Sequence, residues 1–364
     1  MDVRSSFLLG KHVFIKVINL DDRIVQELKT SLQTGSYLPF ETNEMIANYL
    51  LSGVSFDSIT QILTPNTKVL VSSNSYTLND LNKYSLETYE NTLKDLYNNF
   101  VEFNPNFNNI STVLLLSRKV DGNLESFLRL YGPTEKEIAD ALIHLSYIYF
   151  VFSKEYSMLH IDPKINNYTW QKLDQPIDIT YDFSNNVNNK KIVRKNVSHL
   201  FYLTDLEFVY SPIVHTETID NKKVYFNFSQ KYEWLRDDRE NLTFGPRSTL
   251  IEDQKRGNHL IIVPKISSEL YYDYNVNLFL GINGFDNLSD LRTPRMFVID
   301  ILVLVKMILT YDYISYLPAS ISRILHKYFA LFCALSKEEE ENRYSVNYDL
   351  VSPISFAKSL SSIN

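Results

Sequence analysis

The feature that most constrains this fold is a long segment, residues 134–160, that is apolar on nearly every side. Its sequence is TEKEIADALIHLSYIYFVFSKEYSMLH, and Thr134 with Glu137 forms the pattern of a capping box at a helix start. A helix that is apolar nearly all round is buried among other elements. The chain must therefore surround this helix with a substantial core.

Directly after this helix the chain places a cluster of hydrogen-bonding groups. The stretch HIDPKINN contains His160, Asp162, Lys164 and Asn167. Phosphoryl transfer needs a carboxylate to orient and deprotonate a hydroxyl, a cation for the γ-phosphate and a neutral oxygen ligand for Mg²⁺. Asp162, Lys164 and Asn167 offer these three groups in that order. The alternative is that they are ordinary polar residues of a turn after a helix.

This D-x-K-x-x-N pattern resembles the catalytic loop of the protein kinases. The resemblance implies a second metal-binding Asp at the end of a later strand, and Asp205 follows the hydrophobic run in FYLTDLEF. It implies Asp162 as catalytic base, Lys164 as γ-phosphate contact, and Asn167 with Asp205 as Mg²⁺ ligands. The alternative for Asp205 is a turn former at a strand end.

The resemblance extends to the N-terminal part of the chain. HVFIKV matches the kinase strand whose lysine holds the α- and β-phosphates, here Lys16, and TNEMIANYL offers Glu44 to pair with it. The alternatives are a solvated strand lysine and a plain surface carboxylate. The apolar run 111–117 and the RKVDG that follows look like the hinge strand and the adenine-contacting linker. This match implies nucleotide contacts from Arg118, Val120 and Asp121.

The sequence also departs from the family. No glycine-rich phosphate loop precedes Lys16, where only Gly10 occurs. DLE replaces Asp-Phe-Gly, which puts Glu207 beside the metal site and resembles small-molecule kinases of the choline and aminoglycoside type. Ile161 stands where many kinases carry an Arg that senses activation-loop phosphorylation. We therefore expect an open phosphate side of the pocket, slow transfer, and a partner protein or residues within 213–260 acting as a lid.

The interval between Asp162 and Asp205 is long for ordinary protein kinases. The runs QPIDITYDF and KKIVRK predict a hairpin in this interval, with its turn at residues 185–189. Such an insertion resembles haspin-like kinases and the Ser/Thr kinases of large DNA viruses. The phrases SPISFAKSL and FLLGKHVFIKV are most similar to the poxvirus virion-assembly type.

Two further polar residues are predicted to be structural. Asp300 is a charge within the apolar stretch MFVIDILVLVKMIL, and a buried charge needs a partner. In the resembling family an Asp of this helix bonds the catalytic-loop backbone, and we predict that role for Asp300, with Asp273 as the alternative. His160 is predicted to be a structural residue near the same loop.

Local patterns predict the remaining elements. The sequence signals are a hairpin over 5–20 turning at Gly10-Lys11, a helix capped by Asp21, a helix over 42–53 capped by Thr42 and stopped by Gly53, a strand over 67–73, an amphipathic helix around 86–100, an irregular stretch over 213–260, a helical region over 295–335, and a solvated charged loop over 337–343.

Composition narrows the class of protein. The formal net charge is −7, which argues against a general nucleic-acid binder. A single cysteine, Cys333, excludes an intramolecular disulfide and Cys-rich metal sites, and fits a reducing compartment such as the cytoplasm, or a virion if the chain is viral. The most apolar stretch contains Asp300 and Lys306, so no membrane span is expected.

The predicted fold is α+β and bilobal, of the protein-kinase-like class. Residues 1–117 would form the strand-containing N-lobe and residues 118–364 the mainly helical C-lobe. The predicted function is ATP- and Mg²⁺-dependent phosphoryl transfer to Ser/Thr of protein substrates. The alternatives are a catalytically weak or inactive pseudokinase that acts as an interaction scaffold, and a small-molecule kinase.

Overall fold

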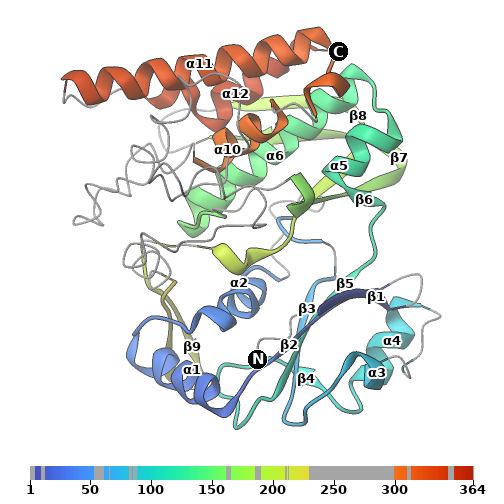
Figure 1. Ribbon diagram of the computed structural model, residues 1–364, viewed down its shortest axis with the longest axis vertical. Helices are drawn as coiled ribbons and strands as arrows, with labels where there is room; N and C mark the ends of the chain where they lie inside the picture. The colour runs from blue at the N-terminus through green and yellow to red at the C-terminus, as the bar shows by residue number, and fades with distance from the viewer. Residues whose placement is uncertain are drawn as a thin grey trace, which may run out of the picture. The chain divides into compact units, whose positions relative to one another are not determined.

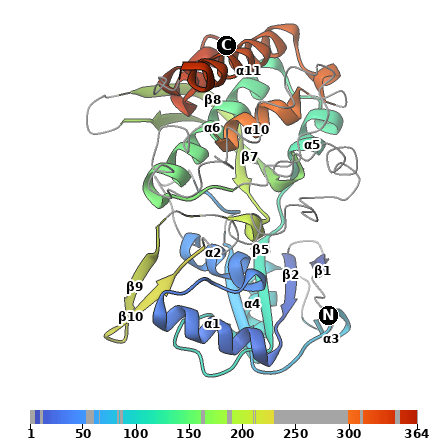
Figure 2. The ribbon, with the colours of Figure 1, turned by 60° about the vertical axis from the view of Figure 1, so that its left-hand side comes forward.

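The computed structural model describes most of the chain between Ser5 and Ile363 (Figures 1 and 2). Residues outside the description are 1–4, 10–12, 53–60, 65, 82–83, 85–87, 161–164, 185–189, 210, 212, 229–298, 310–312, 343–347 and 364. The described part mixes helices and strands, in agreement with the predicted α+β class.

The described chain divides into two compact units. The first contains Met1–Val120 together with Leu203–Lys231, and the second contains Asp121–Tyr202 together with Tyr232–Asn364. The chain therefore leaves the first unit and later returns to it, which a single boundary such as 117/118 does not describe. The division into an N-lobe over 1–117 and a C-lobe over 118–364 remains a prediction.

The first unit is built on a five-stranded sheet. Its strand order is β1-β2-β5-β3-β4, and every pair of neighbours is antiparallel. The strands are β1 (Ser5–Leu9), β2 (Val13–Asn19), β3 (Lys68–Ser72), β4 (Val101–Glu102) and β5 (Thr112–Arg118). The predicted N-terminal hairpin is confirmed, since β1 pairs with β2, and its turn lies outside the described residues.

Alternate side chains of strand β2 point to opposite faces of the sheet. Val13, Ile15 and Val17 are buried in a cluster with residues of β3, β5 and the helices α3 (Leu78–Leu81) and α4 (Tyr89–Leu96). Side chains alternate between faces along a strand, so Lys16 lies on the opposite face. Figure 1 shows α3 and α4 on one side of this sheet and α2 on the other.

Two helices follow β2. α1 (Asp22–Thr34) begins as predicted, because the Asp21 side chain accepts a hydrogen bond from the N–H of Ile24 at 2.9 Å. α2 (Asn43–Leu51) follows a 3-10 turn, η1 (Phe40–Thr42). The predicted Thr42 side-chain cap is wrong, because Thr42 belongs to that turn and its hydroxyl donates to the Pro39 carbonyl at 2.8 Å. The predicted stop at Gly53 lies outside the described residues.

A hairpin forms where irregular structure was predicted. β9 (His215–Ile219) pairs antiparallel with β10 (Lys222–Phe226), and β10 packs on α1 (Figure 2). Its turn contains Asp220 and Asn221, both at positive φ. Asp and Asn tolerate that conformation better than other non-glycine residues, which is why they occur in tight hairpin turns.

The second unit is organised around α6 (Glu135–Tyr156). Its predicted capping box is present, with Thr134 and Glu137 bonding reciprocally. Fifteen of its residues, from Ile138 to Ser153, are buried, so the prediction of a helix buried nearly all round is confirmed. α5 (Leu124–Ser126) and a π-helical turn, η2 (Phe127–Tyr131), precede it, and η3 (Ile165–Asn167) follows it.

A three-stranded sheet covers part of this unit. β6 (Gly122–Asn123), β7 (Tyr168–Asp182) and β8 (Lys191–Leu203) lie in that order. The predicted hairpin before Asp205 is therefore confirmed, since β7 and β8 pair and Phe183 donates to the Lys190 carbonyl at 2.8 Å. Its turn lies outside the described residues.

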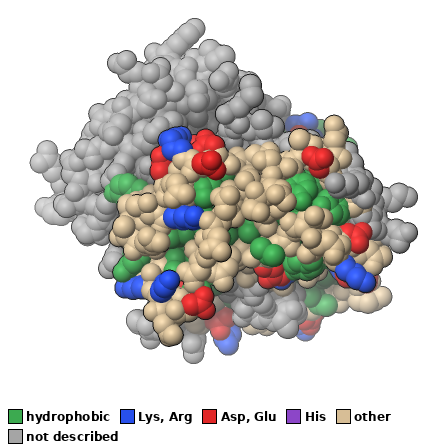
Figure 3. Space-filling model, turned by 90° about the horizontal axis from the view of Figure 1, so that it is seen from below, with side chains coloured by type: hydrophobic (Ala, Val, Ile, Leu, Met, Phe, Trp, Pro, Cys, Tyr) green, Lys and Arg blue, Asp and Glu red, His purple; other side chains and the backbone are tan. Residues whose placement is uncertain are grey.

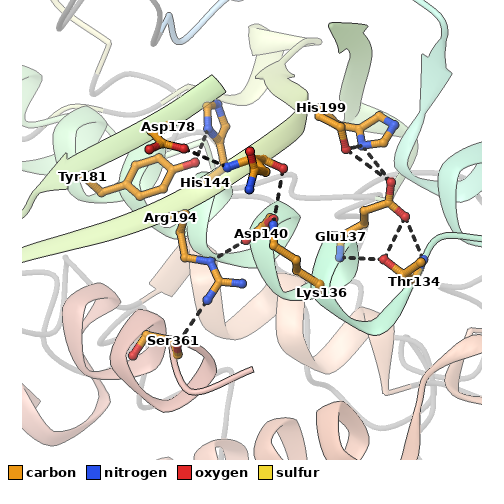
Figure 4. A network of polar contacts seen from close by, with 12 residues as sticks. Thr134, Lys136, Glu137, Asp140, His144, Asp178, Tyr181, Arg194, His199 and Ser361 are labelled. Atoms are coloured by element: carbon orange, nitrogen blue, oxygen red, sulfur yellow. Dashed lines mark hydrogen bonds and ion pairs between the residues drawn. The ribbon is translucent and has the colours of Figure 1, made fainter. Parts of the chain in front are cut away.

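A buried ion network joins α6, β8 and the end of the last helix (Figure 4). Arg194 Nε lies 2.5 Å from Asp140 Oδ1, and Lys136 Nζ lies 2.6 Å from Asp140 Oδ2. Arg194 also donates to the Ser361 carbonyl at 3.1 Å. The side chains of Asp140 and Arg194 are only 6% and 4% exposed, so each neutralises a charge that would otherwise be buried alone.

The C-terminal helices are α10 (Ile299–Ile308), α11 (Ala319–Asn342) and α12 (Pro353–Leu360), with short 3-10 turns η9 (Ile314–Tyr316) and η10 (Tyr348–Val351). α12 packs on α6, where Ser146 donates to the Pro353 carbonyl at 2.6 Å. The predicted loop over 337–343 is wrong for 337–342, which continue α11. Lys and Glu are good helix formers, so a run of them does not by itself indicate a break in a helix.

No helix in the described part of the chain is both long enough and apolar enough to cross a bilayer.

Candidate active site

The strongest polar cluster of the first unit centres on Lys16. The alternation of β2 directs its side chain toward α2, away from the apolar cluster. Its Nζ lies 2.6 Å from Glu44 Oε2 and donates a hydrogen bond to Asp205 Oδ1 at 2.9 Å. Its side chain is 16% exposed, so Lys16 is a mostly buried lysine held by two carboxylates rather than a solvated strand residue.

Glu44 is the deeply buried member of the pair. It lies in the first turn of α2, and its side chain is 3% exposed, which excludes the alternative of a surface carboxylate. α2 is itself fixed from outside, because Tyr49 donates to Glu217 Oε2 on β9 at 3.0 Å. The hairpin that sequence patterns missed therefore supports the helix that carries Glu44.

Asp205 occupies an unusual backbone conformation. Its φ and ψ are 59° and 60°, in the left-handed region that non-glycine residues rarely adopt. It immediately precedes the 3-10 turn η4 (Leu206–Phe208), which packs on α2. The Asp205 carboxylate accepts a hydrogen bond from Lys16, and a Glu207 carboxylate oxygen lies within 4.8 Å of oxygens of Asp205 and Glu44.

Glu44, Asp205 and Glu207 together offer a set of oxygen ligands. One carboxylate oxygen from each lies within 4.8 Å of the others. Hard cations such as Mg²⁺ prefer carboxylate oxygens, so the donor set suits that ion. The Lys16 ammonium contacts two of the three carboxylates, and its single positive charge offsets only one negative charge. A bound cation at Asp205 and Glu207 would therefore compete with the Lys16 ammonium for Asp205.

The local electrostatics depend on burial and on these neighbours. Burial raises the pKa of Glu44 to about 7, an effect that the positive charge of Lys16 opposes and that Asp205 and Glu207 reinforce. Burial alone would lower the pKa of Lys16, but the carboxylates of Glu44 and Asp205 outweigh it and raise that pKa. Lys16 therefore stays charged at neutral pH, while Glu44 is close to its titration point.

The predicted catalytic-loop residues belong to the second unit, and the structure describes only part of them. Asp162 and Lys164 lie outside the described residues. Asn167 is buried at the end of η3, directly before β7. Beside it, Asn166 Oδ1 accepts a hydrogen bond from Asn123 Nδ2 at 3.2 Å. The roles of Asp162, Lys164 and Asn167 remain predictions.

Asp300 binds the backbone just before this stretch. Its Oδ2 accepts a hydrogen bond from the N–H of His160 at 2.7 Å, and both residues are buried. The prediction of a structural role for Asp300 is confirmed, and the structural role of the buried His160 side chain remains a prediction. The alternative candidate, Asp273, lies outside the described residues.

The three predicted linker residues make contacts of their own. Arg118 ends β5, pairs with Glu90 at 2.5 Å and lies over the Tyr89 ring. Val120 is half-buried and ends the first stretch of unit one. Asp121 accepts from the N–H of Lys172 at 2.6 Å. The contacts of Arg118 and Asp121 are structural, and adenine binding by the three residues remains a prediction.

Comparisons with known proteins give little support from outside the chain. No protein-family model matches the sequence, and no curated protein matches it. Among solved structures, the crystal structure of a kinase domain shows 11% identity over 87% of each chain, with a TM-score of 0.28. Neither value establishes a shared fold, so the contacts within this chain carry the functional proposal.

Sequence patterns missed two features that bear on the site. One is the β9–β10 hairpin, which the Asp220-Asn221 pair between two strand-like runs could have signalled. The other is the left-handed Asp205, for which no local signal exists beyond the tolerance of Asp for that conformation.

Proposed function

We propose that this protein binds ATP with Mg²⁺ and transfers its γ-phosphoryl group to Ser or Thr of a protein substrate. The observation that supports this most is the contact of the Lys16 ammonium with two carboxylates, those of buried Glu44 and half-buried Asp205. In protein kinases a strand lysine contacts the nucleotide phosphates while paired to a helix glutamate, and a later Asp holds Mg²⁺.

In this proposal the chain's own groups divide the work. Glu44 holds Lys16 extended, so that its ammonium can contact the α- and β-phosphates. Asp205 and Asn167 are the proposed Mg²⁺ ligands, and the metal would neutralise the charge on the phosphates. Asp162 would accept the proton of the attacking hydroxyl, and Lys164 would contact the γ-phosphate. Nucleotide binding would replace the Lys16–Asp205 hydrogen bond with contacts to phosphate and metal.

One observation favours a second candidate, an inactive nucleotide-binding scaffold. Lys16 binds Asp205 directly, and Glu207 occupies the place of a glycine beside it. Both features crowd the metal site with protein groups. Together with the missing glycine-rich loop they favour weak binding and slow turnover, unless a partner protein completes the pocket.

The test is nucleotide binding by the full chain, followed by transfer. Calorimetry and thermal unfolding with ATP, with and without Mg²⁺, should show Mg²⁺-dependent binding, and ligand at 100 times Kd should stabilise the fold by about 2.7 kcal/mol. Lys16→Met should weaken binding at least about tenfold, the loss of one charge-assisted contact. Lys68→Met removes a lysine from β3 of the same sheet and is the matched control.

Transfer separates the two candidates. Asp162→Asn should abolish phosphorylation of a general protein substrate while ATP still binds, because a base acts on the acceptor hydroxyl. Asp205→Asn should weaken the Mg²⁺-dependent part of binding. A melting temperature that millimolar ATP and Mg²⁺ leave unchanged would overturn the nucleotide site. ATP binding without phosphoryl transfer, both in the isolated chain and with its partners, would support the inactive nucleotide-binding scaffold instead.

A further inference from the structure

A basic pocket of about 300 Å³ lies within the first unit and shares no residue with the Lys16 cluster. Three segments meet around it, namely α1, the connection after β4, and β10. Its polar and aromatic lining comprises Lys29, Gln33, Asn106, Phe107, Asn108, Lys222 and Lys223. Buried Leu32 and Val224 contribute apolar lining. We call this the three-lysine pocket.

The charges of the three-lysine pocket are all of one sign. No Asp or Glu lines it. Among the described residues, no carboxylate oxygen lies within 4.0 Å of the Nζ atom of Lys29, Lys222 or Lys223, so none of the three forms an ion pair. A concave site lined by one sign of charge concentrates its field and attracts counter-ions. In a chain whose net charge is −7, this local excess of positive charge is informative.

Two of the lysines are held in place by neutral groups. Lys29 Nζ donates to the Asn108 carbonyl at 2.5 Å and lies 5.5 Å from the centroid of the Phe107 ring. Lys223 Nζ lies 5.1 Å from the centroid of the Tyr225 ring. An ammonium has three donors, so Lys29 keeps two for a ligand. Neutral contacts of this kind position the cations without cancelling their charge.

One acidic residue lies beside the pocket rather than in it. Asp220, in the turn between β9 and β10, accepts from Asn106 Nδ2 at 2.8 Å. The amide of Asn106 has a second N–H, which stays available for a ligand. Asp220 therefore opposes an anion only from outside the lining, and its removal should favour anion binding.

We propose that the three-lysine pocket binds a phosphate monoester dianion. Lysine ammonium groups act on phosphate as compact point charges, and the amides of Asn106 and Asn108 supply further N–H donors. The volume is at the low end for ligand pockets, which suits one phosphorylated side chain or a free phosphate. On the face drawn in Figure 3, basic and acidic side chains alternate in small groups, unlike the continuous basic surface that nucleic acid requires.

The test uses full-length protein without nucleotide, so it does not depend on the Lys16 site. Calorimetry measures a phosphoserine peptide, its unphosphorylated counterpart and inorganic phosphate. We expect the phosphopeptide to bind, the unphosphorylated peptide not to bind, and added salt to weaken binding. Binding of the peptide more tightly than phosphate would identify a protein-borne ligand, and equal binding would identify the free anion.

The double variant Lys222→Gln with Lys223→Gln should weaken binding at least about tenfold, the loss of one charge-assisted hydrogen bond. Both residues are exposed, so the fold should persist. Lys94→Gln with Lys195→Gln makes the same change in net charge at exposed positions elsewhere and should bind as wild type. Asp220→Asn removes the negative charge beside the pocket and should tighten binding several-fold. The variant should keep the turn, because Asn tolerates the positive φ of this position. No phosphate-dependent binding, or equal weakening by the two double variants, would overturn the proposal.

Discussion

The Asp300 carboxylate on α10 accepts a hydrogen bond from the backbone N–H of His160 at 2.7 Å, although 140 positions separate the two residues. Both groups are buried, so water cannot replace either partner. The contact fixes the backbone two residues before Asp162. It also ties the α10 region, far along the chain, to the end of the segment that follows α6.

Asp300→Ala should lower the free energy of unfolding by about 1–3 kcal/mol, the cost of leaving a buried N–H without an acceptor. If Asp162 acts as the base, the variant should also lose transfer activity, because the backbone before it is no longer fixed. Urea unfolding measures the first effect. Asp174→Ala, at an exposed position of β7, is the control, and an equal loss in both variants would contradict the prediction.

Glu44→Gln should remove a component of the pH dependence of stability. The folded pKa of Glu44, about 7, lies above the usual 4.5, so between these values the folded protein binds more protons than the unfolded chain. The free energy of unfolding should therefore fall as pH rises through this window, by up to about 1.4 kcal/mol per pH unit from this group.

Denaturation in metal-free buffer across that window measures the slope in wild type and in Glu44→Gln. Lys16, Asp205 and Glu207 face the group and stay unchanged in the variant. Glu27→Gln, exposed on α1, should keep the wild-type slope, because Glu44 is intact. An identical slope in Glu44→Gln and wild type would contradict the raised pKa.

His215 should give the pH dependence of stability the opposite sign to that from Glu44, with stability rising as pH rises. Burial lowers its pKa to about 4, below the usual 6.5, so in this window the unfolded chain binds more protons. Its contribution to stability is full above pH 6.5 and is lost as pH falls toward 4. His215→Gln should reduce that acid loss while retaining a hydrogen-bonding group for Ser211, which lies 2.9 Å from Nε2. A steeper acid loss in the variant would contradict the assignment.

Asp140→Asn should be far more damaging than removal of its exposed partner. The substitution leaves the Arg194 guanidinium buried without a counter-charge, which costs about 3–5 kcal/mol. Lys136→Gln breaks an ion pair whose lysine is 31% exposed and should cost at most about 1 kcal/mol. Urea unfolding compares the two variants, and similar losses would show that Arg194 does not depend on Asp140.

Sequence patterns predicted the elements whose signals are local. The Thr134–Glu137 capping box, the Asp21 cap and the β7–β8 hairpin each follow from a few adjacent residues. The predicted side-chain cap at Thr42 was wrong because its hydroxyl donates to the Pro39 carbonyl in the preceding 3-10 turn. The prediction of a loop over 337–343 was wrong for 337–342, because a run of charged residues does not exclude a helix, and Lys and Glu favour one.

The candidate site was predictable where residue types were informative and unpredictable where distant segments meet. Lys16, Glu44 and Asp205 were expected together because of their resemblance to a known pattern, and the structure brings them into contact. No pattern along the chain indicates that Lys29 and Lys223 line one pocket, since β10 reaches α1 only through tertiary packing.

The return of residues 203–231 to the first unit has a consequence for how the chain is made. During synthesis, the sheet of the first unit emerges well before Asp205 and the β9–β10 hairpin, with the whole of Asp121–Tyr202 between them. Until then, α1 lacks the strand that covers it and Lys16 lacks one of its two carboxylates. An N-terminal fragment that ends at Val120 would therefore expose apolar surface and favour aggregation, and the first unit is completed only after much of the second has left the ribosome.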